Sequence, residues 1–428
     1  MDTTQTIDFV IGPHVASHPP RIPAETWEEI FSKLSSPGDL YNVSITSRYI
    51  YNIVNPILYT RLFLDLNHYS TYTLCLLKHD PALACRIKEL TLLPSMNRDA
   101  PARLRKESEA MYRTLRIPLP STVPISRLLP LGVAQVPGAD VENCIRPIFH
   151  FFPSFTGLTN LHIVDDCVPT DFFHWIFELR QLTTLEIRDS IVALELQEND
   201  HPTSLRLQTL SILRCWTRPD LAESYIPGKI CDGLLKNAPL LTSLTVDLFV
   251  ERAACLVLSE MDHPPPIQTL SCHGLGPRDP NCTLFCAVLL NLPTITSLSM
   301  IRAPRELGPA LPKQSLPQLG TLTGQIKTLG FFFEVNRPLQ YITITDGPVV
   351  PGGCLPWENQ LIRFFETLRE HGAVLKGLAF NLSAWSEEVF LCVCQLWPSL
   401  KELKIQCTAP GVDEVCFLEF QTSEIAHC

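Results

Sequence analysis

The stretch 182–187 reads LTTLEI, and its spacing of apolar residues returns along most of the chain. Its apolar residues are Leu182, Leu185 and Ile187, and polar residues stand between them. Successive side chains of a β-strand point to opposite faces, so the second half of the stretch predicts a short strand with one buried face. A single strand of this kind cannot bury that face alone.

Copies of this pattern recur from about residue 158 onward, and most of them start 24 to 36 residues apart. One step of 13 residues follows a degenerate LGTLTG at Leu319, where the register stays open. An outlying copy, IKELTL, starts at Ile87. The main copies are LTNLHI (Leu158), LTTLEI (Leu182), LQTLSI (Leu207), LTSLTV (Leu241), IQTLSC (Ile267), ITSLSM (Ile295), IKTLGF (Ile326), LQYITI (Leu339), LKGLAF (Leu375) and LKELKI (Leu400).

Apolar helical segments precede several copies, among them KICDGLLKN, CTLFCAVLLN, ENQLIRFFETLRE and EEVFLCVCQLW. Pro239, Pro293, Pro317 and Pro398 each stand two residues before a copy, where proline would end a helix. Stacking such units buries the face that each leaves exposed. The spacing resembles leucine-rich repeats. We therefore expect an irregular α/β solenoid over 146–408, with parallel strands on a concave face and helices or loops on the convex face.

The composition excludes several classes of protein. The chain has 428 residues, a net charge of −10 and a pI of about 5.7, which disfavours nucleic-acid binding. The N-terminus is acidic and lacks the apolar core of a signal peptide, and no run approaches the ~18 apolar residues of a membrane span. We expect a cytoplasmic and/or nuclear protein with no membrane partner, in which the 16 cysteines stay reduced.

No motif for catalysis or cofactor binding is evident: there is no H-E-x-x-H, no phosphate-binding loop and no G-x-S-x-G. Cys282 and Cys286 form one pair and Cys392 and Cys394 another, both in apolar segments where thiols act as small hydrophobes. Zinc sites need a second ligand pair at a set spacing. We expect no metal, no cofactor and no enzyme activity. An enzyme with an unrecognised site is a third alternative.

Residues 20–64 differ from the repeats. The segment RIPAETWEEIFSKLSSPGDL (21–40) places apolar residues at helical spacing, Pro23 at a helix start and a break at SSPG. Two shorter apolar segments follow, the first opened by Asp39 as a helix cap. A unit near 40 residues rarely buries enough surface to stand alone, so part of its surface is expected to be an interface.

This segment resembles an F-box. The matching positions are Ile22-Pro23, Glu25, Ile30-Phe31, Leu34, Asp39-Leu40, Val43, Arg48 and Pro56-Ile57-Leu58-Tyr59, and the third-helix sequence TSRY with ILYTRLFL is similar to F-box proteins of mushroom-forming fungi. The resemblance implies a Skp-type adaptor as partner and, through it, a cullin–RING ubiquitin ligase. The implied adaptor-binding residues are Ile22, Pro23, Trp27, Ile30, Phe31, Leu34, Asp39, Leu40 and Val43.

The predicted organisation is therefore a flexible N-terminus (1–19), an F-box (20–64), a connecting region with the outlying repeat and a Pro-rich loop (65–145), the solenoid (146–408) and a C-terminal cap or tail (409–428). The resemblance makes the chain a substrate-recognition subunit of an SCF-type ligase that performs no bond-making step itself. The alternative is a leucine-rich-repeat scaffold whose helical unit only caps the solenoid.

Residues that flank the buried strand positions should point outward onto the concave face and meet an unknown protein substrate. The middle of that surface is rich in hydroxyls and nearly uncharged, so we expect no phosphate recognition there; the alternative is that Ser and Thr are simply tolerated on exposed strands. The substrate-facing residues are His162, Glu186, Arg188, Ser211, Thr245, Asp247, Ser271, His273, Ser299, Tyr341, Thr343, Asn381 and Lys404.

Overall fold

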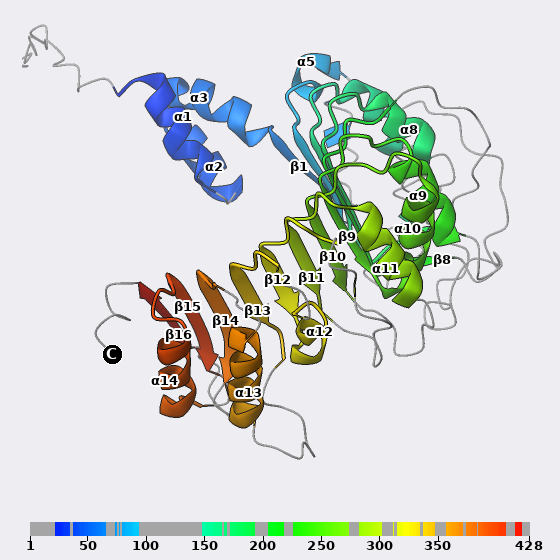
Figure 1. Cartoon of the computed structure of the whole chain (residues 1–428). Coiled ribbons are helices and arrows are strands. Elements are labelled where there is room, and N and C mark those ends of the chain that lie inside the picture. Colours follow the sequence, from blue (N-terminus) through cyan, green and yellow to red (C-terminus); the bar gives the residue numbers. More distant parts are fainter. Residues whose placement is uncertain are drawn as a thin grey trace, which may run out of the picture. The chain divides into compact units, whose positions relative to one another are not determined.

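The computed structural model divides into two compact units, Met1–Arg61 and Leu62–Cys428 (Figure 1). Two of the predicted segments, the N-terminal segment 1–19 and the Pro-rich loop of the connecting region, lie outside the described residues. The structure describes residues 22–34, 37–65, 73–74, 77, 79–93, 148–164, 167–168, 172–192, 204–217, 226–273, 282–301, 311, 315–333, 337–346, 357–370, 374–382, 384–407 and 416–421.

The first unit consists of three helices, α1 (Ala24–Ser32), α2 (Pro37–Ser44) and α3 (Arg48–Leu58). Ser47 caps α3, because its hydroxyl accepts the Ile50 N–H at 3.1 Å. A small core holds the helices together, formed by Phe31, Leu40, Ile53 and Val54, with Trp27 stacked on Phe31 at 5.2 Å between ring centroids.

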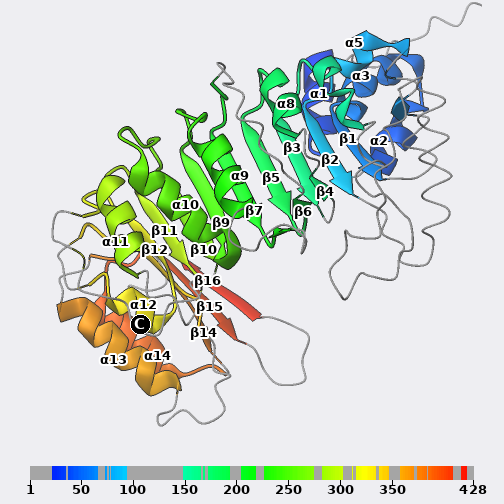
Figure 2. The same cartoon turned by 90° about the vertical axis from the view of Figure 1, so that its right-hand side faces the viewer.

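The second unit is an open α/β solenoid, as the sequence predicted (Figures 1 and 2). Its main sheet runs parallel from β2 to β15, and β16 pairs antiparallel with β15 at one end. The strands, in their order across the sheet, are β1 (Arg61–Asp65), β2 (Glu89–Leu93), β3 (Asn160–Val164), β5 (Thr184–Arg188), β7 (Thr209–Leu213), β9 (Ser243–Asp247), β10 (Thr269–His273), β11 (Ser297–Met300), β12 (Thr321–Gly324), β13 (Tyr341–Ile344), β14 (Gly377–Leu382), β15 (Glu402–Cys407) and β16 (Cys416–Gln421).

Helices and a second small sheet follow the strands along the chain. Within the second unit, the larger helices lie along one face of the main sheet, and none of this unit's labelled helices covers the other face, called the open face below (Figures 1 and 2). The helices are α5 (Pro81–Ala84), the 3-10 helix η1 (Phe152–Ser154), α8 (Phe172–Glu178), α9 (Ile226–Leu235), α10 (Leu248–Glu260), α11 (Cys282–Asn291), α12 (Ile326–Gly330), α13 (Trp357–Glu370) and α14 (Glu387–Leu396); the small sheet joins β4 (Cys167–Val168), β6 (Ile191–Val192) and β8 (Trp216–Thr217).

The core consists of side chains stacked in register from one strand to the next. The strands alternate between half-buried and buried residues, as in β5 and β7. Each fully buried leucine or isoleucine stabilises the fold by about 1.5–3 kcal/mol relative to an exposed one. The second apolar position of the repeat forms one such row: Leu161, Leu185, Leu210, Leu244, Leu270, Leu298, Leu322, Ile342, Leu378 and Leu403.

One predicted strand is wrong. The pattern predicts a strand in IKTLGF (326–331), but residues 326–330 form helix α12. The degenerate copy LGTLTG forms the strand β12 instead. The carboxylate of Asp346 accepts the Ile326 N–H at 2.7 Å and so fixes the start of the helix. The outlying copy IKELTL does form a strand, β2, which pairs parallel with β3. The solenoid sheet therefore extends into the region expected to be a connection.

The described buried thiols belong to this core. Burial raises the pKa of Cys215 to about 12 and raises the pKa values of Cys231 and Cys272 as well. Thiols held protonated in this way are poor nucleophiles near neutral pH. These cysteines thus act as small apolar side chains.

Gly157 marks a close backbone contact between the first two described repeats. A Cβ at this position would lie 2.3 Å from the Cys85 carbonyl oxygen, a backbone atom that cannot move aside. We expect Gly157→Ala to destabilise the solenoid by about 1–3 kcal/mol, measured as a lower urea midpoint. The control is Gly330→Ala in α12, where an added Cβ meets nothing within 4 Å. Equal midpoints for the two variants would contradict this close contact.

Candidate functional site

The three-helix unit leaves several large apolar side chains in contact with solvent. Ile30 is 43% exposed and Ile45 is 66% exposed. Ile30 remains outside because α1 packs into the core through Phe31, and Ile45 follows the end of α2, which packs through Leu40. A marginal helical unit that exposes this much apolar surface fits a protein–protein contact. The full set is Ile22, Ile30, Tyr41, Ile45, Tyr49 and Tyr51.

The predicted adaptor residues fall into three groups. Ile22, Pro23, Ile30 and Asp39 are exposed. Trp27, Leu34 and Val43 are half-buried against the small core, whereas Phe31 and Leu40 are buried in it, so their role lies in folding the unit.

Tyr41, Ile45, Tyr49 and Tyr51 were missed by the sequence interpretation. Tyr41, Tyr49 and Tyr51 are large residues outside the buried stripe of their own helices, and Ile45 follows the end of α2; those positions are the signal that could have found them. Tyr49 also joins two parts of the unit, because its hydroxyl donates to the Ile22 carbonyl oxygen at 3.5 Å.

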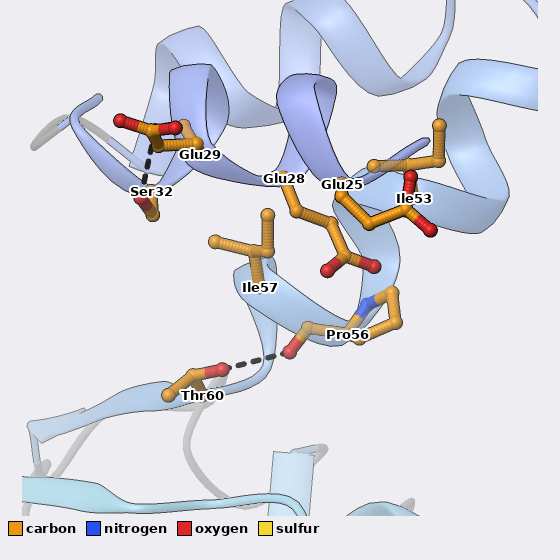
Figure 3. A pocket seen from close by; sticks show the side chains of 8 residues that line it. All are labelled: Glu25, Glu28, Glu29, Ser32, Ile53, Pro56, Ile57 and Thr60. Carbon is orange, nitrogen blue, oxygen red and sulfur yellow. Dashed lines mark hydrogen bonds between the residues drawn. The ribbon is translucent and has the colours of Figure 1, made fainter. Parts of the chain in front are cut away.

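A pocket of about 450 Å³ lies between α1 and α3 (Figure 3). One wall carries Glu25, Glu28 and Glu29 with Ser32, and the other is formed by Ile53, Pro56, Ile57 and Thr60. Lys33 offsets part of the negative charge, since its ammonium lies 3.0 Å from a Glu29 carboxylate oxygen. The pocket is therefore acidic on one wall and mostly apolar on the other.

The open face of the solenoid presents two rows of outward-pointing residues. The first row runs from Thr184 to Tyr341 and the second from His162 to Lys404, each in register across the parallel strands. The second row brings together most of the predicted substrate-facing residues: His162, Glu186, Ser211, Thr245, Ser271, Ser299, Thr343 and Lys404. All of them are half-buried or exposed.

A chain of charged groups crosses one end of the open face. The His162 Nδ1 lies 2.8 Å from a Glu186 carboxylate oxygen, and the other oxygen of Glu186 lies 3.7 Å from the Arg188 guanidinium. Arg214 donates from Nε and Nη2 to the two oxygens of Asp189, each at 2.6 Å. The Arg214–Asp189 pair is thus doubly hydrogen-bonded, whereas Arg188 makes only longer ion-pair contacts and its Nε has no hydrogen-bond partner among the described residues. Asp189 and Arg214 were not among the predicted residues.

Asp247 does not lie on the surface as predicted. Its side chain is buried at the end of β9. One carboxylate oxygen accepts a hydrogen bond from the backbone N–H of Arg214, and the other accepts one from the backbone N–H of Val250 at 3.4 Å. It therefore caps α10 and joins two repeats. The neighbouring His273 stays exposed on β10; its partial burial lowers the pKa of the imidazole, against the opposing field of Asp247.

We expect Asp247→Ala to lower the free energy of unfolding by about 2–4 kcal/mol, because the backbone N–H groups of Arg214 and Val250 lose a buried hydrogen-bond acceptor. Asp247→Asn keeps one acceptor oxygen and should cost less than half as much. Urea denaturation of the full chain measures both variants. An alanine variant with the wild-type midpoint would show that Asp247 does not act as a cap.

Tyr341 has the largest side chain of the first row, which otherwise holds Thr and Ser from Thr184 to Thr321. It is 40% exposed, and a Cβ on Gly377 of the next strand would lie 2.5 Å from the tyrosine ring. The ring therefore lies across β14 in space that only a glycine leaves open. Asn381 stands farther along β14, and its carbonyl oxygen accepts the Trp357 indole N–H at 2.7 Å.

Within the described part of the chain, no three His, Cys, Asp or Glu side chains gather as metal ligands would. The described helices likewise include none long and apolar enough to cross a membrane. In comparisons with known proteins, residues 20–65 match the family model described as F-box-like. No curated protein matches the chain. The matched range coincides with the three-helix unit and its exposed apolar side chains.

Proposed function

We propose that this chain, which carries an F-box-like domain at residues 20–65, is the substrate-recognition subunit of an SCF-type cullin–RING ubiquitin ligase. The observation that carries the proposal is the coincidence of that match with a compact three-helix unit that leaves Ile22, Ile30 and Ile45 exposed. F-box domains typically bind a Skp-type adaptor. In this proposal the adaptor covers the exposed apolar side chains of the unit.

The solenoid would hold a protein substrate on its open face. Its repeating pattern resembles leucine-rich repeats, and we propose that the solenoid is of that type. We also propose that the whole chain is related to the F-box proteins of mushroom-forming fungi. Such a subunit makes no bond itself. It raises the local concentration of a substrate near a ubiquitin-loaded partner and so converts an encounter into an effectively intramolecular transfer. A ligase subunit of this kind would act in the cytoplasm and/or the nucleus.

The second candidate is a leucine-rich-repeat scaffold in which the helical unit only caps the solenoid. The capping requirement of stacked repeats favours this alternative, since a terminal repeat must cover its apolar end. A cap, however, gives no reason for the several solvent-exposed Tyr and Ile side chains of the helical unit.

Co-expression of the full chain with a Skp-type adaptor and a cullin separates the two candidates. The proposal expects a ternary complex on gel filtration, with the cullin retained only when the adaptor is present. A chain that elutes alone in the presence of both partners would favour the scaffold. Cullin retained without the adaptor would contradict the proposed order of assembly.

A further inference from the structure

The middle of the open face consists of hydroxyl groups. From β7 to β13, the first two outward positions of every strand carry one, and the two rows stand side by side in register. The first row is Thr209, Ser243, Thr269, Ser297, Thr321 and Tyr341, and the second is Ser211, Thr245, Ser271, Ser299, Thr323 and Thr343.

The second row of hydroxyls is open to a ligand. Its members are half-buried, and no other described residue forms a hydrogen bond with any of the six side-chain hydroxyls from Ser211 to Thr343. A hydroxyl both donates and accepts a hydrogen bond. The row therefore matches a neutral partner that also carries donors and acceptors, such as the amide groups of an extended polypeptide.

The charged groups at the two ends of the face do not supply a phosphate site. At one end the guanidinium of Arg214 is held by Asp189 through two hydrogen bonds of 2.6 Å. At the other end the Lys404 ammonium lies 2.9 Å from a Glu402 carboxylate oxygen. A phosphate group needs arginines that are free to contact it. Between the ends, the hydroxyl rows carry no formal charge.

Tyr341 adds an apolar contact at the edge of the hydroxyl rows. Its ring lies across Gly377, and the next outward position of β14 is Ala379. Small residues beside an exposed aromatic ring leave room for an apolar side chain of a partner. The face thus combines a neutral polar strip with one apolar contact point.

We propose that the open face binds an extended, uncharged and unphosphorylated segment of a protein substrate, with its amide groups on the hydroxyl rows and an apolar side chain on Tyr341. This inference rests on the proposed function and names the substrate class of that surface. A phosphate group on the bound segment would bring a charge of about −1.5 to −2 against two hydroxyl rows that carry no positive charge from β7 to β13. Phosphorylation therefore blocks binding.

The test uses two matched libraries of random peptides with a fixed central serine, one unphosphorylated and one phosphorylated, on the immobilised full chain. We expect the unphosphorylated library to be enriched at least about tenfold over its partner, a difference of 1.4 kcal/mol. Thr245→Asp and Tyr341→Ala should each remove the enrichment. Thr367→Asp, which places the same charge on the exposed surface of α13, should leave it unchanged.

Preference for the phosphorylated library, capture of neither library, or full enrichment on Thr245→Asp would each overturn the inference. Adaptor binding is measured on the same proteins. It should persist in Thr245→Asp, because that residue lies in the solenoid and not in the helical unit. A wild-type chain that does not bind the adaptor but still enriches the unphosphorylated library would refute the ligase proposal. The inference about the open face would remain supported.

Discussion

Replacing Leu244 by aspartate should abolish the cooperative unfolding transition of the solenoid. Leu244 is 1% exposed and lies in register between Leu210 and Leu270, so the new carboxylate would stand in a row of apolar side chains. An unpaired buried charge costs several kcal/mol, which is comparable with the whole stability of an ordinary domain of about 5–15 kcal/mol. Thermal unfolding followed by circular dichroism is the measurement.

The matched control is Thr245→Asp, which introduces the same charge one residue later on the open face. Because Thr245 is half-exposed, its variant should melt within about 1 kcal/mol of the wild type. A Leu244→Asp chain that melts like this control would contradict the register of the sheet. It would also remove the basis for the two hydroxyl rows.

Phe31→Ala should unfold the three-helix unit while the solenoid stays folded. Phe31 is 4% exposed and belongs to a core of few residues, with the Trp27 ring stacked on it. Truncating a buried phenylalanine costs about 3–5 kcal/mol, and a unit near 40 residues has little stability in reserve. Limited proteolysis should cut between residues 22 and 60 in the variant, and adaptor binding should be lost.

The control for this prediction is Tyr51→Ala, which removes an exposed ring from α3 and leaves the small core intact. It should resist proteolysis as the wild type does, since surface substitutions usually change stability by less than about 0.5 kcal/mol. Protease resistance of Phe31→Ala would mean that the unit draws its stability from other contacts. Global unfolding of that variant would show that the two units do not fold separately.

The repeat pattern was enough to predict most of the solenoid, because a buried row imposes its period on the sequence. It failed where two copies compete: LGTLTG and IKTLGF both fit a strand, and the choice depends on a cap from Asp346, 20 residues after Ile326. Helix α10 was not expected either, since LFVERAACLVLSE follows β9 with no proline or glycine to mark a boundary.

The surfaces were predictable to different degrees. Strand alternation located the second row of the open face, but it placed Asp247 outside, whereas the chain turns there into α10 and buries the carboxylate. The ion pair of Asp189 with Arg214 depends on strand ends whose backbone φ angles are 56° and 50°, which strand alternation does not predict. Such contacts between repeats are visible only in the folded chain.

The central claim is that the helical unit binds a Skp-type adaptor through its exposed apolar residues. A titration of purified adaptor against the full chain, wild type and Ile30→Asp, tests it most directly. Ile30 lies outside the small core, so the thermal melt of the variant should equal that of the wild type. Desolvating the new carboxylate in the interface should cost about 3 kcal/mol, which is roughly a hundredfold loss of affinity. Ser32→Asp, on the pocket side of α1, serves as the control and should bind normally. A wild type that does not bind the adaptor, or an Ile30→Asp chain that binds it as well as the wild type, would contradict the account.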